Sequence, residues 1–163
     1  MFRELRRKKQ LLSRSVAEDI LNRKSSGVLA LSGDDSYPYA VPLSYVFDGE
    51  TLCFHCAKAG HKLDAIRHSE KASFCVIDKD EVLSEEYTTY FRSVIAFGRI
   101  RILEDEGEKR AALEKLALKY APDSTQEDRY GEIQREWNHV CVLEMKIEHM
   151  TGKEAIELVR ARP

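Results

Sequence analysis

The sequence predicts a mainly β protein with added helices, of the α+β class, and within that class a small antiparallel barrel with helices packed outside. Several short apolar runs alternate with a period of two, which is typical of strands. The dipeptide Asp48-Gly49 between two such runs is a strong hairpin signal and favours antiparallel pairing. The strands also lack the regular strand–helix alternation of a doubly wound parallel sheet.

The composition is that of a globular domain. The chain has 163 residues, which suits one domain spanning 1–163, and 43% of them are hydrophobic and 33% charged. The net charge of −2 lacks the global basic excess of nucleic-acid-binding proteins. No apolar run approaches the roughly 18 residues of a membrane span, and the start lacks the apolar core of a signal peptide. We therefore expect a cytoplasmic protein with four reduced cysteines and no nucleic-acid or membrane partner.

The segment of about residues 1–13 is locally basic, through Arg3, Arg6, Arg7, Lys8 and Lys9. It could act as an arm that contacts a phosphate or a protein partner. A solvated chain end explains the same composition and is the interpretation that we prefer.

The first predicted helix follows a capping-box pattern, in which Ser15 precedes Glu18 by three positions. Its apolar face continues to about Lys24. Residues 28–32 then form a short apolar strand, and residues 33–36 supply the Gly, Asp and Ser residues of a turn.

Residues 39–47, YAVPLSYVF, alternate cleanly and predict the next strand. Pro42 lacks an N–H group, which places it at an edge, at a bulge, or where something other than a strand approaches. The Asp48-Gly49 turn pairs this strand with a second one over residues 51–56.

The second strand leads through a turn of small residues at 57–60 into a helix that starts with His61 and Lys62 and stops near Ser69. The first N–H groups of a helix have no acceptor inside it and carry partial positive charge, so they bind phosphate well. Lys62 adds a mobile full charge. We interpret this strand–turn–helix unit as an anion site that holds the phosphate of a cofactor.

The second half begins with a strand over residues 72–77 and an acidic segment, residues 78–86, that we expect to be a loop. A long strand follows over residues 90–103. Gly98 in its middle indicates a bulge or the close approach of another group.

Two helices and a strand complete the chain. An amphipathic helix is predicted over residues 105–120, and the pair Ser124 and Glu127 forms a second capping box that opens another helix. The last strand spans residues 139–150, and the remainder is expected to be a turn and an irregular tail. The predicted inward faces of the two helices are Leu113, Leu116, Ala117 and Tyr120 in the first and Tyr130, Ile133 and Trp137 in the second.

Cys53 and Cys56 form a C-x-x-C pattern, which zinc sites and redox-active dithiols share. On a strand, however, positions three apart point to opposite faces, so the two thiols would diverge. No second C-x-x-C pattern completes a zinc site. We prefer buried structural cysteines and no metal, and keep a zinc or thiol-redox protein as a remote alternative.

His55 lies between these cysteines, a few positions before the anion turn. It could face a ligand and donate a proton near neutral pH. It could equally be a hydrogen-bonded histidine at the barrel rim, and the residues alone leave both roles open. Patterns for a serine nucleophile, a P-loop or a G-x-G-x-x-G turn do not occur.

Several motifs occur together: YPYAVPLSY, a hairpin, the run F-H-x-A-x-x-G-x-K-L-x-x-I and a late TGK, with FRELRRKKQ, GVLAL and SVIAFGRIRIL around them. This combination resembles the FMN-binding split-barrel superfamily, the pyridoxamine 5′-phosphate oxidase-like group. More narrowly, it is similar to the branch of nitroimidazole-resistance (Nim-type) flavoproteins. The resemblance covers roughly residues 3–153.

The resemblance implies a six-stranded antiparallel split β-barrel with peripheral helices, and a homodimer with FMN at the interface. The turn at Gly60 would hold the phosphate, and the ring would lie along the strand before the hairpin, contacted mainly through its backbone. The implied cofactor-binding residues are Val41, Pro42, Leu43, Ser44, Tyr45, His55, Cys56, Ala57, Gly60, His61, Lys62, Ser93 and Val94, the last two from the partner subunit.

The resemblance also implies an activity. His55 would lie near the ring or substrate pocket, as the matching histidine does in Nim-type members, and is the candidate catalytic residue. The protein would be an FMN-dependent oxidoreductase that passes electrons from an NAD(P)H donor or a partner to a small molecule, for example a nitroaromatic. A non-enzymatic flavin- or haem-binding sensor on the same barrel is the alternative. The Arg-rich contacts of true pyridoxamine phosphate oxidases are missing, so vitamin B6 oxidation is not expected.

Overall fold

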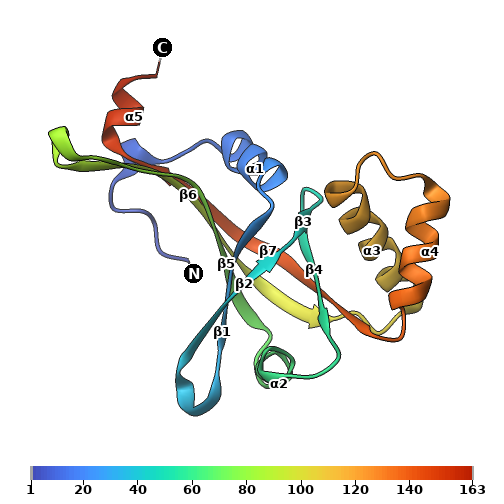
Figure 1. The fold of residues 1–163 in the computed structure, drawn as a ribbon. Coiled ribbons are helices and arrows are strands. Elements are labelled where there is room, and N and C mark those ends of the chain that lie inside the picture. Colours follow the sequence, from blue (N-terminus) through green and yellow to red (C-terminus); the bar gives the residue numbers. More distant parts are fainter. Residues whose placement is uncertain (1, 163) are drawn as a thin grey trace.

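A seven-stranded antiparallel sheet forms the body of the protein, with helices outside it (Figure 1). The structure is a computed structural model and describes residues 2–162. The strands lie in the order β2-β1-β5-β6-β7-β4-β3. Their bounds are β1 Ser26–Ser32, β2 Pro38–Ser44, β3 Val46–Phe47, β4 Thr51–Ala57, β5 Lys71–Leu83, β6 Thr88–Ile102 and β7 Val140–Glu154. The predicted mainly β class with helices is confirmed.

The helices surround this sheet. The α-helices are α1 Arg14–Arg23, α2 His61–His68, α3 Glu106–Tyr120, α4 Gln126–Glu136 and α5 Ile156–Arg160. Short 3₁₀ turns are η1 Lys8–Gln10, η2 Asp34–Ser36 and η3 Ser84–Glu86. In the described part of the chain, no helix is both long and apolar enough to cross a membrane.

The barrel closes at a single residue. β2 and β3 are separated only by Tyr45, yet they lie at opposite ends of the strand order. The chain therefore passes directly from one edge of the sheet to the other, which brings both edges together. If β2 and β3 are counted as one bent strand, the barrel has the six strands predicted from the sequence.

Tyr45 is held on both sides of this closure. Its side chain is fully buried, and its hydroxyl donates a 2.8 Å hydrogen bond to the Leu21 carbonyl in α1. Its backbone N–H donates to the hydroxyl of Tyr120, the last residue of α3, over 2.8 Å. The Tyr120 hydroxyl in turn donates a hydrogen bond to the Tyr45 carbonyl over 2.7 Å. These bonds satisfy backbone groups at the point where the strand ladders are interrupted.

The core has two parts. Inside the barrel, Tyr45 and Phe54 pack edge-on against Phe74, at ring-centroid distances of 4.9 and 5.1 Å. A second apolar cluster lies outside the barrel, where α3 packs against β4 and β7 and α4 packs against α3. β4 contributes to both clusters, because Phe54 faces the interior and Cys53 faces the helices.

The long strand β6 is bulged where the sequence predicts a bulge. Its register with β7 shifts between Phe97 and Gly98. A Cβ atom on Gly98 would lie 2.0 Å from the Lys146 carbonyl oxygen, so only glycine permits this approach of the two strands.

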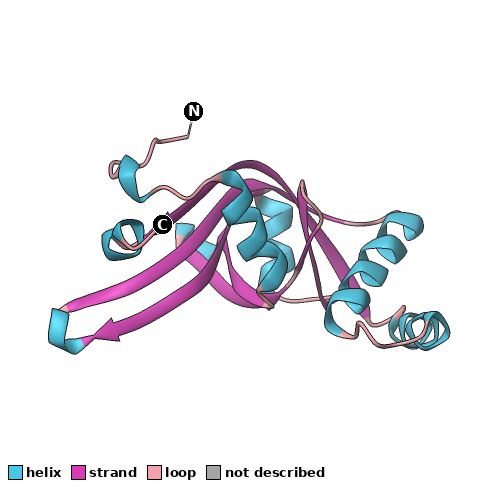
Figure 2. Ribbon diagram, turned by 90° about the horizontal axis from the view of Figure 1, so that it is seen from above, coloured by secondary structure: helices cyan, strands magenta, loops and turns pink. Residues whose placement is uncertain are grey.

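The acidic segment 78–86 is not a loop, so that prediction is wrong. β5 and β6 continue beyond the barrel as a two-stranded ribbon that ends at η3 (Figure 2). Both faces of a projecting ribbon meet water, so its side chains carry no apolar alternation that would reveal a strand. Asp78 at the base is an exception, because its carboxylate is 4% exposed and pairs with Arg23 at 2.5 Å and Arg92 at 3.3 Å.

The cap of the first helix lies two residues earlier than predicted. α1 begins after Ser13, whose hydroxyl accepts a hydrogen bond from the Val16 N–H, so the predicted capping box at Ser15 is wrong. Leu12 donates its N–H to the Gly152 carbonyl, which anchors the chain to β7 just before the helix.

The cap of α4 lies one residue later than predicted. Thr125 and Asp128 exchange both hydrogen bonds of a capping box, in place of Ser124 and Glu127. The Ser124 hydroxyl instead donates to the Ala121 carbonyl and belongs to the preceding turn.

The C-terminal part is more regular than predicted. β7 continues to Glu154, and α5 follows in place of the irregular tail. The Glu154 carboxylate is 1% exposed and pairs with Arg92 at 2.8 Å and Arg162 at 2.5 Å. A buried carboxylate requires such partners, and they attach the chain end to the barrel.

Candidate functional site

Two of the unpaired strand edges in residues 2–162 lie next to each other below the closure at Tyr45. β2 ends the strand order, so its edge away from β1 is unpaired. β4 pairs with β3 only through Leu52 and Cys53, so residues 54–57 are unpaired on the side away from β7. β2 and β4 are in contact and separate after the closure at Tyr45. These two free edges form the split of the barrel.

On β2, the antiparallel ladder determines which backbone groups point into the split. The Gly33 N–H donates to the Tyr37 carbonyl at 2.8 Å, so Gly33 and Tyr37 form a hydrogen-bonded pair. In an antiparallel ladder such pairs alternate with pairs whose N–H and C=O groups point outward. Along the register with β1, the N–H groups of Ala40 and Ser44 therefore point away from β1. Pro42 occupies the outward position between them and has no N–H, which confirms its predicted place at an edge.

The same rule applies to β4. The Ile147 N–H donates to the Glu50 carbonyl at 3.0 Å, so Glu50 and Ile147 form a hydrogen-bonded pair. His55 and Ala57 belong to the alternate pairs of this ladder, and they therefore direct their N–H and C=O groups away from β7. Their side chains are also exposed. The split thus presents backbone donors at Ser44, His55 and Ala57 that have no partner strand among residues 2–162.

The turn after β4 provides further donors. Gly60 precedes α2 with φ +127°, a conformation that L side chains rarely adopt. No side chain caps α2, and the N–H of Leu63 bonds to the Gly60 carbonyl at 2.9 Å. The N–H groups of His61 and Lys62 precede this first turn and are available to an anion. The predicted strand–turn–helix unit is confirmed.

Lysines concentrate positive charge beside this turn. Lys62 is half-buried near Cys56, and neither it nor Lys58 or Lys109 forms an ion pair with a carboxylate within residues 2–162. The Lys109 ammonium donates to the Trp137 carbonyl at 2.8 Å and lies 4.3 Å from that ring's centroid. Burial lowers the pKa of Lys109, and the positive charge of Lys58 lowers it further. Unpaired positive charge of this kind favours a bound anion.

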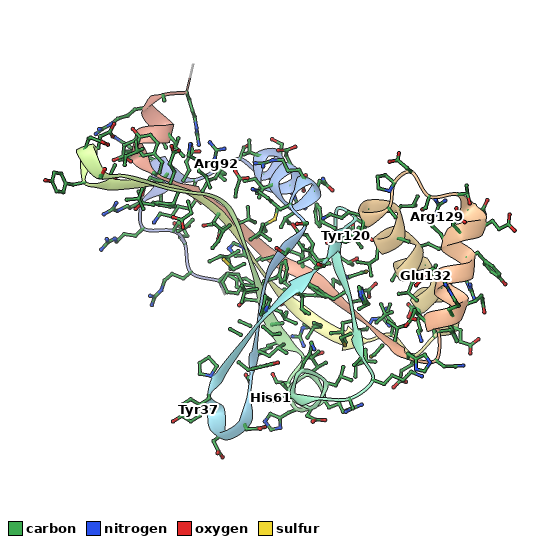
Figure 3. All side chains as sticks on the ribbon, viewed as in Figure 1. Tyr37, His61, Arg92, Tyr120, Arg129 and Glu132 are labelled. Atoms are coloured by element: carbon green, nitrogen blue, oxygen red, sulfur yellow. The ribbon has the colours of Figure 1, made fainter. Side chains whose placement is uncertain are left out.

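His61 has a different environment from its neighbours. Its ring stacks on Tyr39 of β2 at a centroid distance of 4.1 Å, and its Nε2 lies 3.7 Å from an Asp34 carboxylate oxygen. Figure 3 shows it close to the turn between β1 and β2. The His61 side chain therefore joins α2 to β2, and only its backbone N–H remains free for a phosphate.

A cavity of about 390 Å³ lies between the sheet and the helices α3 and α4. Ser44 and His55, both predicted site residues, line it together. The other lining residues are Leu113, Leu116, Ala117, Tyr120, Glu132, Ile133, Glu136 and Val140. The predicted inward face of α3 is confirmed, because its four residues all line this cavity. The predicted inward face of α4 is correct at Ile133 and Trp137 but wrong at Tyr130, which is 57% exposed.

The C-x-x-C cysteines diverge as the strand geometry predicts. Cys53 packs under the outer helices, whereas Cys56 packs toward the barrel interior beside its cross-strand partner Cys141. Burial raises the pKa of Cys56 to about 11, and the adjacent Cys141 contributes. A thiol with a raised pKa is a poor nucleophile and metal ligand, so these cysteines have the environment of structural residues.

Other predicted residues face away from the split. Val41 and Leu43 pack against the barrel core and lie in hydrogen-bonded pairs with β1. Tyr45 and Val94 are fully buried, and their backbone N–H groups are occupied by Tyr120 and by the neighbouring strands. Ser93 and Val94 pair with β7 at Lys153 and Gly152, near the opposite end of that strand from the partner of Cys56. One chain alone does not bring them to the split.

Tyr120, Lys58, Lys109, Glu132 and Glu136 were missed as site residues by sequence reasoning. Only Tyr120 carried a signal, its place on the apolar face of α3, and that signal indicated packing. The others look like ordinary surface charges in the sequence, because only the tertiary fold brings them to the cavity or the turn.

The donor set fits a flavin nucleotide. A phosphate requires N–H groups and positive charge, which the start of α2 and Lys62 provide. The ring's polar edge accepts hydrogen bonds, which the strand-edge N–H groups of Ser44, His55 and Ala57 can donate. The apolar cavity beside Ser44 and His55 suits a second aromatic ligand next to that ring.

Comparison with known proteins finds structures with this fold. One structure with the same fold is a protein from Bacteroides thetaiotaomicron provisionally named for 5-nitroimidazole antibiotic resistance, with a TM-score of 0.74, 20% identity, and coverage of 88% of this chain and 86% of that one. A FAD and haem binding protein from Mycobacterium smegmatis has a TM-score of 0.74 and 24% identity, over 95% of this chain and 80% of that one. A conserved hypothetical protein from Mycobacterium tuberculosis has a TM-score of 0.80 and 20% identity, over 98% and 94%.

No curated protein sequence matches the chain. The family model for pyridoxamine 5′-phosphate oxidase, in contrast, matches residues 13–154, which include every strand and the turn before α2. The chain therefore belongs to the pyridoxamine 5′-phosphate oxidase family.

Proposed function

We propose that the protein is a homodimeric flavoprotein that holds FMN in the split of its barrel and acts as an oxidoreductase on a small molecule. One observation carries this proposal: the unpaired backbone donors of Ser44, His55 and Ala57 lie on strand edges beside the uncapped start of α2 and Lys62. An aromatic ring with a polar edge and a phosphate tail matches this combination.

The residues have separate roles in this proposal. The N–H groups of His61 and Lys62, with the Lys62 ammonium, hold the phosphate, and Gly60 provides the backbone conformation that exposes them. The strand-edge donors orient the ring. FMN supplies the electron transfer when it is bound.

His55 is the proposed proton donor or substrate anchor. It is exposed, lies on the outer face of β4 and lines the cavity that a small molecule can enter. Its backbone N–H points into the split, so the same residue lies beside both the proposed ring site and the cavity.

The partner subunit completes the site in this proposal. Ser93 and Val94 lie far along the barrel from the turn, so they would reach a flavin only from a second copy. NAD(P)H is the proposed electron donor. A nitroaromatic is the proposed acceptor, a choice supported by the name of the Bacteroides thetaiotaomicron structure.

The first experiment is the spectrum of the purified protein. We expect a yellow protein with flavin absorption, and FMN rather than FAD as the released chromophore. Anaerobic mixing with NAD(P)H should then bleach the flavin, and a nitroaromatic should restore it. A colourless protein that takes up neither added FMN nor FAD contradicts the proposal, and a flavin that no donor reduces supports the sensor instead.

Replacing Lys62 by alanine tests the phosphate site. We expect the Kd for FMN to rise by about 10- to 150-fold, because a charge-assisted hydrogen bond contributes about 1.5–3 kcal/mol. Fluorescence titration of FMN measures this change. Lys146→Ala is the matched control, because this exposed lysine lies opposite Thr51, at the other end of β4 from the turn. An unchanged Kd for Lys62→Ala removes this residue from the site.

A further inference from the structure

The cavity beside His55 has apolar walls. α3 supplies Leu113, Leu116 and Ala117, α4 supplies Ile133, and β7 supplies Val140. Its volume of about 390 Å³ lies within the usual range for small-molecule pockets. It can therefore enclose one aromatic ring with a short substituent.

Two carboxylates line this cavity. Within residues 2–162 they are Glu132 and Glu136, which lie one helical turn apart on α4, and His55 is the one basic side chain in the lining. Figure 3 shows Glu132 on the side of α4 that faces α3. Among residues 2–162, no lysine or arginine lines the cavity.

The two carboxylates are not equivalent. Glu132 pairs with Arg135, which neutralises part of its charge. Glu136 has no ion-pair partner in the described chain. Glu136 is therefore the carboxylate that is free to bind a cation at the cavity mouth.

The other polar groups of the cavity lie near the closure of the barrel. The Tyr120 hydroxyl is bonded to the Tyr45 backbone, so its ring has a fixed position in the wall. Ser44 and His55 belong to the strand edges of the split. A ligand in the cavity would thus lie next to those edges.

We propose that this cavity is the substrate site and that it selects small aromatic molecules carrying an ammonium group, which Glu136 binds. This inference rests on the proposed function, because Ser44 and His55 connect the cavity to the flavin edge. Anionic substrates are disfavoured, because their charge would meet two carboxylates and neither a lysine nor an arginine of the described chain. The phosphorylated compound after which the family is named is disfavoured here for the same reason.

Three ligands of similar shape test the charge preference by isothermal titration calorimetry on the purified protein with its bound flavin. They are benzylamine, which is cationic at neutral pH, neutral benzyl alcohol and anionic benzoate. We expect benzylamine to bind at least about tenfold more tightly than benzoate, with benzyl alcohol in between. Benzoate binding as tightly as benzylamine, or no measurable binding by any of the three, overturns the proposal.

Glu136→Gln locates the effect. We expect it to weaken benzylamine binding about 3- to 10-fold while benzyl alcohol is unaffected, because only the charge is removed. Glu127→Gln is the matched control on the same helix, since Glu127 does not line this cavity. If both variants bind benzylamine like the parent, the cation binds elsewhere and the proposal fails. Flavin absorption of the same samples separates the two proposals. A yellow protein without the charge preference overturns only this inference, whereas a protein that takes up no flavin overturns the proposed function.

Discussion

β4 has two faces with opposite characters. On the inner face, Leu52 and Phe54 are fully buried in the barrel core, and Phe54 packs against Phe74. On the outer face, His55 is exposed in a cavity with polar groups, and its backbone N–H has no partner strand in the described chain. Adjacent residues of one strand therefore belong to different environments.

This difference shows how a barrel can combine rigidity with a binding site. The alternation of strand side chains separates the two tasks by a single residue, so a change at one position need not disturb the other. Stability is expected to depend on the inner face and on Cys53, which packs under the helices, and ligand binding on the outer face from His55 onward and on the free edge. Variants that affect both properties together would contradict this division.

The largest expected effect is that of Phe54→Ala. Removing a fully buried aromatic side chain from a close-packed core should lower the free energy of unfolding by about 3–5 kcal/mol. Urea denaturation followed by circular dichroism measures the change. His55→Ala, one residue later, should alter the free energy of unfolding by less than about 0.5 kcal/mol, as is usual for exposed positions. A comparable loss in both variants would show that the outer face also carries the fold.

Tyr120→Phe tests the junction between the two faces. The variant removes the acceptor of the Tyr45 N–H while it leaves the ring in the cavity wall. We expect a loss of about 1–3 kcal/mol in the free energy of unfolding, since a part-buried backbone donor is left unsatisfied. The Tyr45 amide should also exchange hydrogen faster. Unchanged exchange at Tyr45 would mean that the closure does not depend on α3.

The smallest expected effect concerns Asp48, in the turn that starts β4. Burial would raise the pKa of Asp48, but hydrogen bonds from Lys115 of α3 and from Thr51 outweigh it and lower this pKa to about 2. The carboxylate therefore contributes stability above pH about 4, and this contribution is lost as the pH falls through about 2. Because the site is partly exposed, we expect about 1 kcal/mol.

Asp48→Asn should remove this pH dependence. Acid denaturation between pH 5 and pH 2 compares the free energy of unfolding of the variant with that of the parent. The parent should be more stable at pH 5, and this difference should shrink as the pH falls toward 2. Parallel acid-denaturation curves over the whole interval would show that the contact of α3 with this turn adds no stability.

Most of the barrel could be predicted from the sequence because its strands have one apolar face. The hairpin at Asp48-Gly49, the edge position of Pro42 and the bulge at Gly98 each follow from a backbone requirement of one residue. The ribbon at 78–86 could not be predicted this way, because a strand solvated on both faces has the composition of a loop.

The candidate site was only partly predictable. The anion turn at 57–60 is local in sequence, so its residue types indicate it directly. The cavity is not local, because it forms where Ser44 and His55 meet residues of α3 and α4. Glu136 has no feature in the sequence that distinguishes it from other exposed carboxylates. Only the packing of the helices on the sheet reveals its position.

The strand order also has a consequence for the order of folding. β1, β2, β5 and β6 can pair with one another as soon as residues 26–102 have been synthesised. β4 must wait, because its long partner is β7, the last strand of the chain. Such distant pairing is slow, and until it occurs the edges of the early sheet are exposed to other chains. The turn at 57–60 is attached to β4, so the proposed phosphate site becomes complete only after the whole barrel has been made.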